Sequence, residues 1–138
     1  MVLQVIIERS PDGLFSAYIP DYTWKDEYSF GGFGDTAEEA KADFMTSIEE
    51  VRQMYHEATG EVAEELQNVQ VEWQYDLPSM FECLPYLNIT RFASVAGINA
   101  SKMRQYARGI AYPSTSTMDK ITFALNTIAK EITTIRFR

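Results

Sequence analysis

A short basic segment, "GINASKMRQYARG" (97–109), holds the side chains of this sequence that are best suited to binding a ligand. If it is helical, Met103 and Tyr106 share the inner face. The outer face then carries Ser101, Lys102, Arg104, Gln105 and Arg108. Arg and Gln have the fork geometry that reads guanine and adenine edges in the DNA major groove, whereas Lys and hydroxyl groups suit phosphates. We therefore expect these five residues to be the base-reading candidates of a DNA-binding helix.

Residues that flank this segment are candidates for contacts with the DNA backbone. They are Thr90, Arg91, Tyr112, Ser114 and Thr115. The last three stand just before a predicted helix N-terminus, where backbone N–H groups favour a phosphate. The alternative is an amphipathic helix whose basic side is simply solvated.

The basic segment belongs to a predicted pair of helices, near 90–96 and 100–108. Thr90 is expected to cap the first helix, with Phe92, Ala93 and Ala96 facing inward. Gly97 provides the left-handed exit, and Asn99 or Ser101 caps the second helix. Two helices joined by a tight Gly turn are typical of a helix-turn-helix, whose second helix fits the major groove.

The remaining elements follow from apolar spacing and turn residues. Strands are expected at 2–9, 14–20 and 29–34, then a helix from Thr36 to Gly60 and a fourth strand at 69–76. A short helix near 79–84 precedes the predicted pair, and a longer helix near 115–131 follows it. The tail 133–138 alternates like a strand and would need a partner from this chain or a second copy. The fold class is therefore α+β, with a β-β-β-α-β domain at 1–77 and a helical domain with a C-terminal strand at 78–138.

Charge divides the chain at the same place. Residues 1–78 hold four Lys/Arg against 17 Asp/Glu, a net charge of −13, and residues 79–138 hold eight against three, a net charge of +5. A polarity this sharp predicts two modules with partners of opposite sign. The alternative for the acidic half is a surface that only keeps the protein in solution.

Several function classes find no support in the residues. The single Cys83 excludes an internal disulfide and a Cys-rich zinc site, and the absence of long apolar runs predicts a soluble, cytoplasmic protein. Glu8, Glu72 and the lone His56 do not form a metal-binding or catalytic pattern, and no phosphate-binding or nucleophile motif is present. We expect no catalysis, no metal and no cofactor.

Both halves resemble a known family. The segments "YIPDY" (18–22), "GDTAEEA" (34–40) and "INASKMRQYARG" (98–109), in this order and spacing, are similar to those of HicB antitoxins. More broadly, residues 96–125 resemble the helix-turn-helix of phage repressors. The resemblance covers nearly the whole chain.

This resemblance implies a partial ribonuclease-H-like fold for the N-terminal domain, followed by a DNA-binding domain. It implies that the acidic domain binds and silences a small basic HicA-type toxin that cleaves mRNA. It also implies that the basic domain binds double-stranded operator DNA of its own gene pair, as a homodimer or higher homo-oligomer. The protein would then be an antitoxin and an autorepressor.

Candidates for the toxin contact lie in and beside the loop after the second strand. They are Tyr18, Asp21, Tyr22 and Trp24. Aromatic side chains and exposed carboxylates suit such an interface, but the aromatic residues could equally belong to the core. Two other functions stay open: a stand-alone transcriptional regulator with a different N-terminal partner or ligand, and an interaction protein that has lost its affinity for DNA.

Overall fold

The computed structural model describes all residues, 1–138, and the chain is an α+β protein of two compact units, Met1–Ser79 and Met80–Arg138. We call them the N-terminal unit and the C-terminal unit. The N-terminal unit contains a sheet and one long helix, and the C-terminal unit is helical. The predicted domain boundary, between residues 77 and 78, lies at the start of a helix, α2 (Leu77–Cys83), that spans the division.

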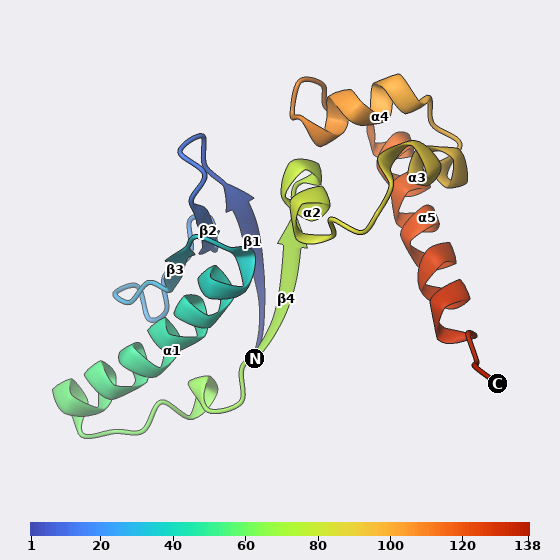
Figure 1. Cartoon of the computed structure of the whole chain (residues 1–138). Helices are drawn as coiled ribbons and strands as arrows, with labels where there is room; N and C mark the ends of the chain where they lie inside the picture. The colour runs from blue at the N-terminus through green and yellow to red at the C-terminus, as the bar shows by residue number, and fades with distance from the viewer. The chain divides into compact units, whose positions relative to one another are not determined.

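The N-terminal unit is built on a mixed four-stranded sheet (Figure 1). Its strands are β1 (Val2–Arg9), β2 (Phe15–Tyr18), β3 (Gly31–Gly34) and β4 (Gln70–Tyr75), in the order β3-β2-β1-β4. The β1–β2 and β2–β3 pairs are antiparallel and the β1–β4 pair is parallel. The predicted strands at 14–20 and 29–34 are thus real but shorter.

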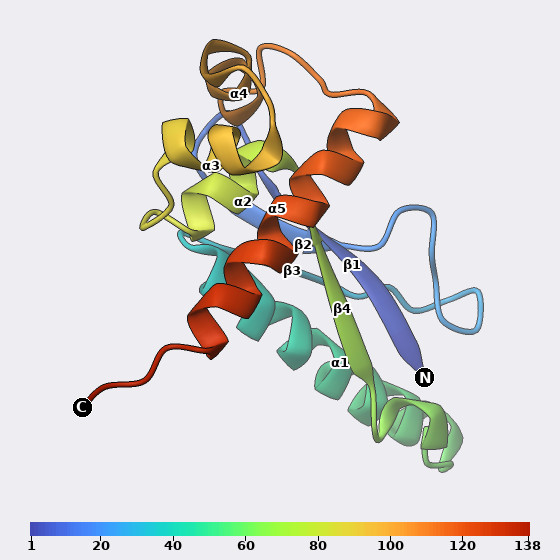
Figure 2. The ribbon, with the colours of Figure 1, turned by 90° about the vertical axis from the view of Figure 1, so that its right-hand side faces the viewer.

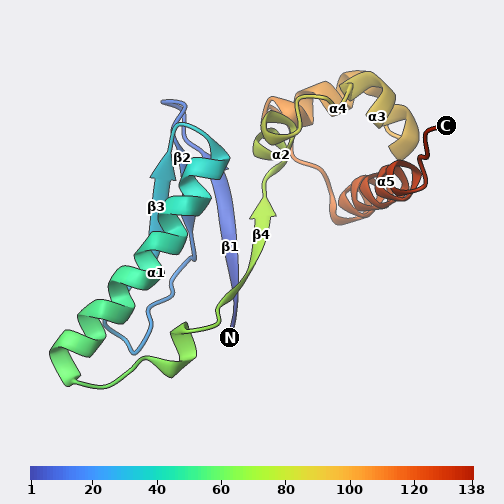
Figure 3. The same cartoon turned by 60° about the horizontal axis from the view of Figure 1, so that its bottom comes forward.

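One helix, α1 (Ala37–Thr59), packs on β2 and β3 (Figure 3). The Thr36 hydroxyl accepts from the Glu39 N–H at 3.1 Å, and the Glu39 carboxylate accepts from the Asp35 N–H at 2.8 Å. Gly60 ends the helix with a left-handed φ of 74°. The predicted start and end of the helix are confirmed, and Phe44 and Ile48 lie on its buried side.

The approach of β3 to α1 depends on Gly32. A Cβ atom at this position would overlap with the Ala40 carbonyl oxygen and the Phe44 backbone nitrogen. Glycine at this position therefore permits the close approach of the two backbones. It lets α1 lie near enough to bury Phe44 completely.

The C-terminal unit continues with three further helices, α3 (Ile89–Ala96), α4 (Ala100–Ala107) and α5 (Thr115–Thr133). Helix α3 packs against both α4 and α5, and its Phe92 ring lies 5.6 Å from the ring of Phe81 on α2. The core is completed by Ala93, Met103 and Ile121. Each predicted helix in this region is present, with ends that differ by at most two residues.

Two features of the structure differ from the expectations. A short 3-10 helix, Glu64–Leu66, follows α1 and buries Ala63 and Leu66, which the sequence pattern did not indicate. The expected strand at 133–138 is absent: α5 continues to Thr133, and residues 135–138 are irregular (Figure 2). A strand gains its hydrogen bonds from a neighbouring strand, and the tail has no such neighbour in this chain.

None of the helices has the length and apolar content needed to cross a lipid bilayer.

Candidate nucleic-acid interface

The turn between α3 and α4 is defined by backbone hydrogen bonds at Gly97. Gly97 has a φ of 69°, and the Ile98 N–H donates to the Ala93 carbonyl at 2.9 Å. The Asn99 side chain then caps α4, since its Oδ1 accepts from the N–H groups of Ser101 (2.9 Å) and Lys102 (3.2 Å). Glycine at the left-handed position and an Asn cap together fix a sharp, well-determined turn.

The inner sides of α3 and α4 are buried as predicted. Ala93 and Met103 are completely buried, and Phe92, Ala96 and Tyr106 nearly so. The small side chain of Ala93 lets α4 approach α3 closely. This packing fixes the rotation of α4 about its axis, so that the opposite side of the helix must face outward.

The outward side is the basic face, which we define as Ser101, Lys102, Arg104, Gln105 and Arg108. All five side chains are exposed. The Arg104 Nη1 donates to the Thr90 hydroxyl at 3.2 Å, and the Lys102 Nζ lies 5.8 Å from the centre of the Tyr106 ring. The structure thus brings the base-reading candidate Arg104 to the phosphate candidate Thr90, 14 residues earlier, a pairing that helical spacing alone did not indicate.

The stretch of chain that carries the basic face has charges of one sign. No Asp or Glu occurs from Cys83 to Met118, whereas Arg91, Lys102, Arg104 and Arg108 lie in this range. None of these four cations forms an ion pair, in contrast to Lys41 and Arg52 of the N-terminal unit. Unpaired cations on one surface raise the local concentration of a polyanion. Arg104 and Arg108 at the C-terminal end of α4 also interact favourably with the helix dipole, which accords with the alternative of a merely solvated face.

The predicted cap of α3 needs correction. Asn88, not Thr90, is the N-cap: its Oδ1 accepts from the Arg91 N–H at 3.0 Å. The signal was present, because Asn is as good an N-cap residue as any and precedes Thr90 by two positions. Thr90 lies in the first turn instead, which leaves its hydroxyl free for Arg104.

The remaining phosphate candidates surround the start of α5. Ser114 is its N-cap, and the Ser114 hydroxyl accepts from the Thr117 N–H at 3.3 Å. Tyr112 has no such structural role and is 87% exposed. Arg91 and Thr115 are exposed as well. The hydroxyl of Ser114 is thus occupied by capping, whereas Tyr112 and Arg91 present unoccupied polar groups.

Among the toxin-contact candidates, Tyr18 lies on the face of the sheet opposite α1. Its hydroxyl donates to the Glu8 carboxylate at 2.6 Å. This hydrogen bond, with smaller contributions from burial and the negative charges of Glu8 and Asp76, raises the pKa of Tyr18 above its ordinary value of 10.0. Tyr18 is half-buried, so part of its side chain is exposed to solvent.

The other three candidates in the loop have different surroundings. Trp24 is only 3% exposed: its ring packs edge-on against Tyr55 at 5.0 Å, and its Nε1 donates to Glu65 at 3.0 Å. The alternative of a core residue is therefore the one that the structure favours for Trp24. Tyr22 is half-buried on Phe30, and Asp21 is exposed with a φ of 50°.

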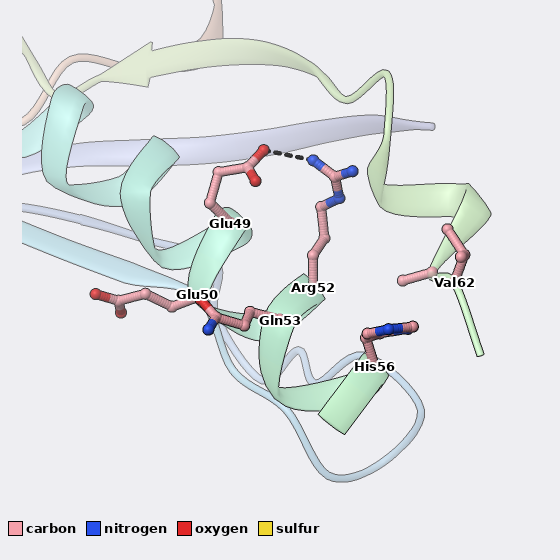
Figure 4. Close-up of a pocket in the computed structure, with 7 residues that line it drawn as sticks. Glu49, Glu50, Arg52, Gln53, His56 and Val62 are labelled. Carbon is pink, nitrogen blue, oxygen red and sulfur yellow. Dashed lines mark hydrogen bonds and ion pairs between the residues drawn. The ribbon is translucent and has the colours of Figure 1, made fainter. Parts of the chain in front are cut away.

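A shallow groove of about 400 Å³ lies between the second half of α1 and residues 62–63 (Figure 4). Glu49 and Arg52 face each other in an ion pair there, and His56 Nδ1 lies 3.1 Å from the Glu61 carbonyl oxygen. Two of its charged side chains are thus occupied by each other. No group of three or more His, Cys, Asp or Glu side chains in the chain is placed to hold a metal ion.

Comparisons with models of protein families, with characterised proteins and with solved structures found no match to this chain.

Proposed function

We propose that the C-terminal unit is a helix-turn-helix that binds double-stranded DNA, with α4 as the recognition helix. The observation that carries the proposal is the basic face: five exposed polar or basic side chains on one helix, fixed outward by the burial of Met103 and Tyr106. Arg104, Gln105 and Arg108 would contact base edges. Arg91 on α3 and Tyr112 between α4 and α5, which flank the basic segment, would contact phosphates.

We propose further that the whole chain is an antitoxin of the HicB type that represses its own operon. The acidic N-terminal unit supports this part, because 17 carboxylates against four cations suit a small basic partner such as a HicA-type toxin. Its four-stranded sheet with one long helix is compatible with a partial ribonuclease-H-like module. Tyr18, Asp21 and Tyr22 remain as contact candidates, whereas Trp24 would act by shaping the loop.

The mechanism in this proposal is binding alone. The N-terminal unit covers the RNA-binding surface of the toxin, and the recognition helices of a homodimer occupy two half-sites of a palindromic operator. No catalytic step, metal or cofactor is involved, and the protein acts in the cytoplasm. A stand-alone regulator is the second candidate, favoured by the burial of Trp24, which removes one aromatic anchor from the proposed toxin contact.

A capture experiment distinguishes the two candidates. The full chain, tagged and expressed in its native cells, is purified and the proteins bound to it are identified by intact mass. A small basic protein that cleaves mRNA when isolated, and loses this activity when the chain is added back, is the result expected of an antitoxin. DNA binding by the full chain without such a partner would instead establish the stand-alone regulator.

A further inference from the structure

Helix α4 ends in a turn that fixes the backbone of Ile110 beside the last turn of the helix. Gly109 has a left-handed φ of 72°. Its N–H donates to the Tyr106 carbonyl at 3.1 Å, and the Ile110 N–H donates to the Gln105 carbonyl at 3.0 Å. This pair of hydrogen bonds around a left-handed glycine defines a Schellman motif. The backbone therefore places Ile110 next to Gln105, a member of the basic face.

The side chain of Ile110 lacks the contact that usually accompanies such a turn. The residue after the left-handed glycine commonly packs an apolar side chain on the residue five or six positions earlier. In this chain those positions hold Gln105 and Arg104, which are both polar and exposed. Ile110 itself is 69% exposed. The motif therefore presents a branched apolar side chain to solvent instead of burying it.

The surroundings of Ile110 restrict the kind of ligand that it can contact. No Asp or Glu occurs between Glu82 and Asp119, and every exposed residue of α4 is polar or charged. A surface that docks a protein gathers several apolar side chains at its centre, which this helix does not do. The ligand that suits this surface is an anion with a small apolar group at one place.

Double-stranded DNA carries such a group in its major groove. The 5-methyl group of thymine lies on the base edges there, beside the polar atoms that Gln and Arg side chains bind. Isoleucine has no hydrogen-bonding group in its side chain, so it gains nothing from a phosphate. It does gain from covering a methyl group and removing it from water.

We propose that Ile110 contacts the 5-methyl group of a thymine beside the base that Gln105 contacts. The proposal rests on DNA binding through α4, and it adds a residue that determines specificity outside the basic face. Thymine is the one standard DNA base that carries this methyl group. The contact therefore selects thymine at one position of each half-site.

Deoxyuridine tests the contact, because it pairs with adenine as thymidine does and lacks only the methyl group. Thymines of the DNA site selected by the full chain are replaced one position at a time, symmetrically in both half-sites. Fluorescence anisotropy at a fixed salt concentration measures the affinity of each duplex. Burial of one methyl group changes affinity by about fourfold, so its loss from both half-sites should weaken binding by about 15-fold at one position.

Variants of the chain assign this effect to Ile110. Ile110→Ala should bind the thymine and deoxyuridine duplexes equally at that position, whereas Ile110→Val should keep the preference for thymine. Ile132→Ala is the matched control, because it makes the same change at an exposed Ile of α5 (57%) and should keep the full preference. Circular dichroism checks that all three variants retain their helices.

The outcomes separate the methyl contact from DNA binding itself. A chain that binds no duplex contradicts the proposed function, and the methyl contact with it. A wild-type chain that binds DNA specifically but tolerates deoxyuridine at every position overturns the methyl contact alone. The contact is also overturned if Ile110→Ala keeps the preference for thymine, because another side chain then contacts the methyl group, or if Ile132→Ala loses it.

Discussion

Arg104 links the proposed base contacts to the proposed phosphate contacts. Its guanidinium lies on the basic face of α4 and donates a hydrogen bond to the Thr90 hydroxyl of α3 at 3.2 Å. In the proposed function, this hydrogen bond would orient the side chain before DNA binds. A pre-oriented Arg loses less conformational freedom on binding than a freely rotating one. Arg104 is accordingly the residue of the basic face whose removal should cost most.

Replacement of Arg104 tests its role as a base-reading residue. We expect Arg104→Ala to weaken binding to the selected DNA site by about 1–3 kcal/mol and to relax specificity at one base position. Fluorescence anisotropy with matched and mismatched duplexes measures both effects. Lys130→Ala removes the same charge from α5 and should leave affinity nearly unchanged. An equal loss in both variants would indicate a general charge effect.

The Tyr18–Glu8 contact makes a prediction for alkaline pH. The pKa of Tyr18 is raised in the folded chain by the hydrogen bond to Glu8, so the unfolded chain loses this proton first. The contact therefore contributes its full stability below pH 10.0, and that contribution is lost as pH rises through the folded pKa.

Glu8→Gln removes the charge and should lower the pKa of Tyr18 toward its ordinary value. The phenolate absorbance of Tyr18 is obtained by subtracting a Tyr18→Phe titration in each background. An unchanged Tyr18 titration in Glu8→Gln would show that the contact is not formed in solution.

Residue identity alone predicted the inner and outer sides of α3 and α4, because apolar and charged side chains alternate with the period of a helix. It did not distinguish Asn88 from Thr90 as the cap, since both side chains can accept the same type of hydrogen bond. Residue identity also could not predict that Trp24 is buried, because its burial depends on Tyr55 and Glu65, which lie more than 30 residues away in sequence.

At the scale of elements, Gly97 and Gly32 are required for different reasons. Gly97 has a left-handed φ of 69° with open space where a Cβ would lie, so Gly97→Ala should cost only the conformational strain, about 1–2 kcal/mol. Gly32 lies against the backbone of α1, so Gly32→Ala must displace a helix from a sheet and should cost more.

The two units provide separate signals for this comparison. Both tryptophans, Trp24 and Trp73, belong to the N-terminal unit. In urea, Gly32→Ala should shift the transition seen by tryptophan fluorescence. Gly97→Ala should leave that transition in place and shift only the helical circular dichroism. A fluorescence shift in Gly97→Ala would mean that the units unfold together.

The elements themselves were largely readable from the sequence, where capping residues and left-handed glycines mark both ends of a helix. The 3-10 helix at Glu64–Leu66 was not, because three residues give no periodicity. The expected strand at 133–138 was wrong because alternation alone does not make a strand: a neighbouring strand must supply the hydrogen bonds, and the tail has none in this chain.

At the scale of the whole molecule, the chain separates its charges between two units, and the DNA proposal predicts how binding responds to salt. The logarithm of affinity should fall with the logarithm of salt concentration, with a slope of about −0.9 for each phosphate contact. Arg91→Ala should reduce the size of that slope by about 1, since Arg91 is a phosphate candidate. Lys25→Ala, in the acidic unit, should not change it. A salt-independent affinity would exclude a nucleic acid as the ligand.

The central claim is that the basic face of α4 reads DNA sequence. The most direct test is selection of bound duplexes from a random DNA library by the full chain, as wild type and as Arg104→Ala/Arg108→Ala. Lys130→Ala/Arg138→Ala, with two cations removed elsewhere in the same unit, is the control. We predict that wild type and control enrich a palindrome with half-sites about one helical turn apart, and that the α4 variant enriches none. No enrichment by wild type, or the same palindrome from the α4 variant, would contradict the claim.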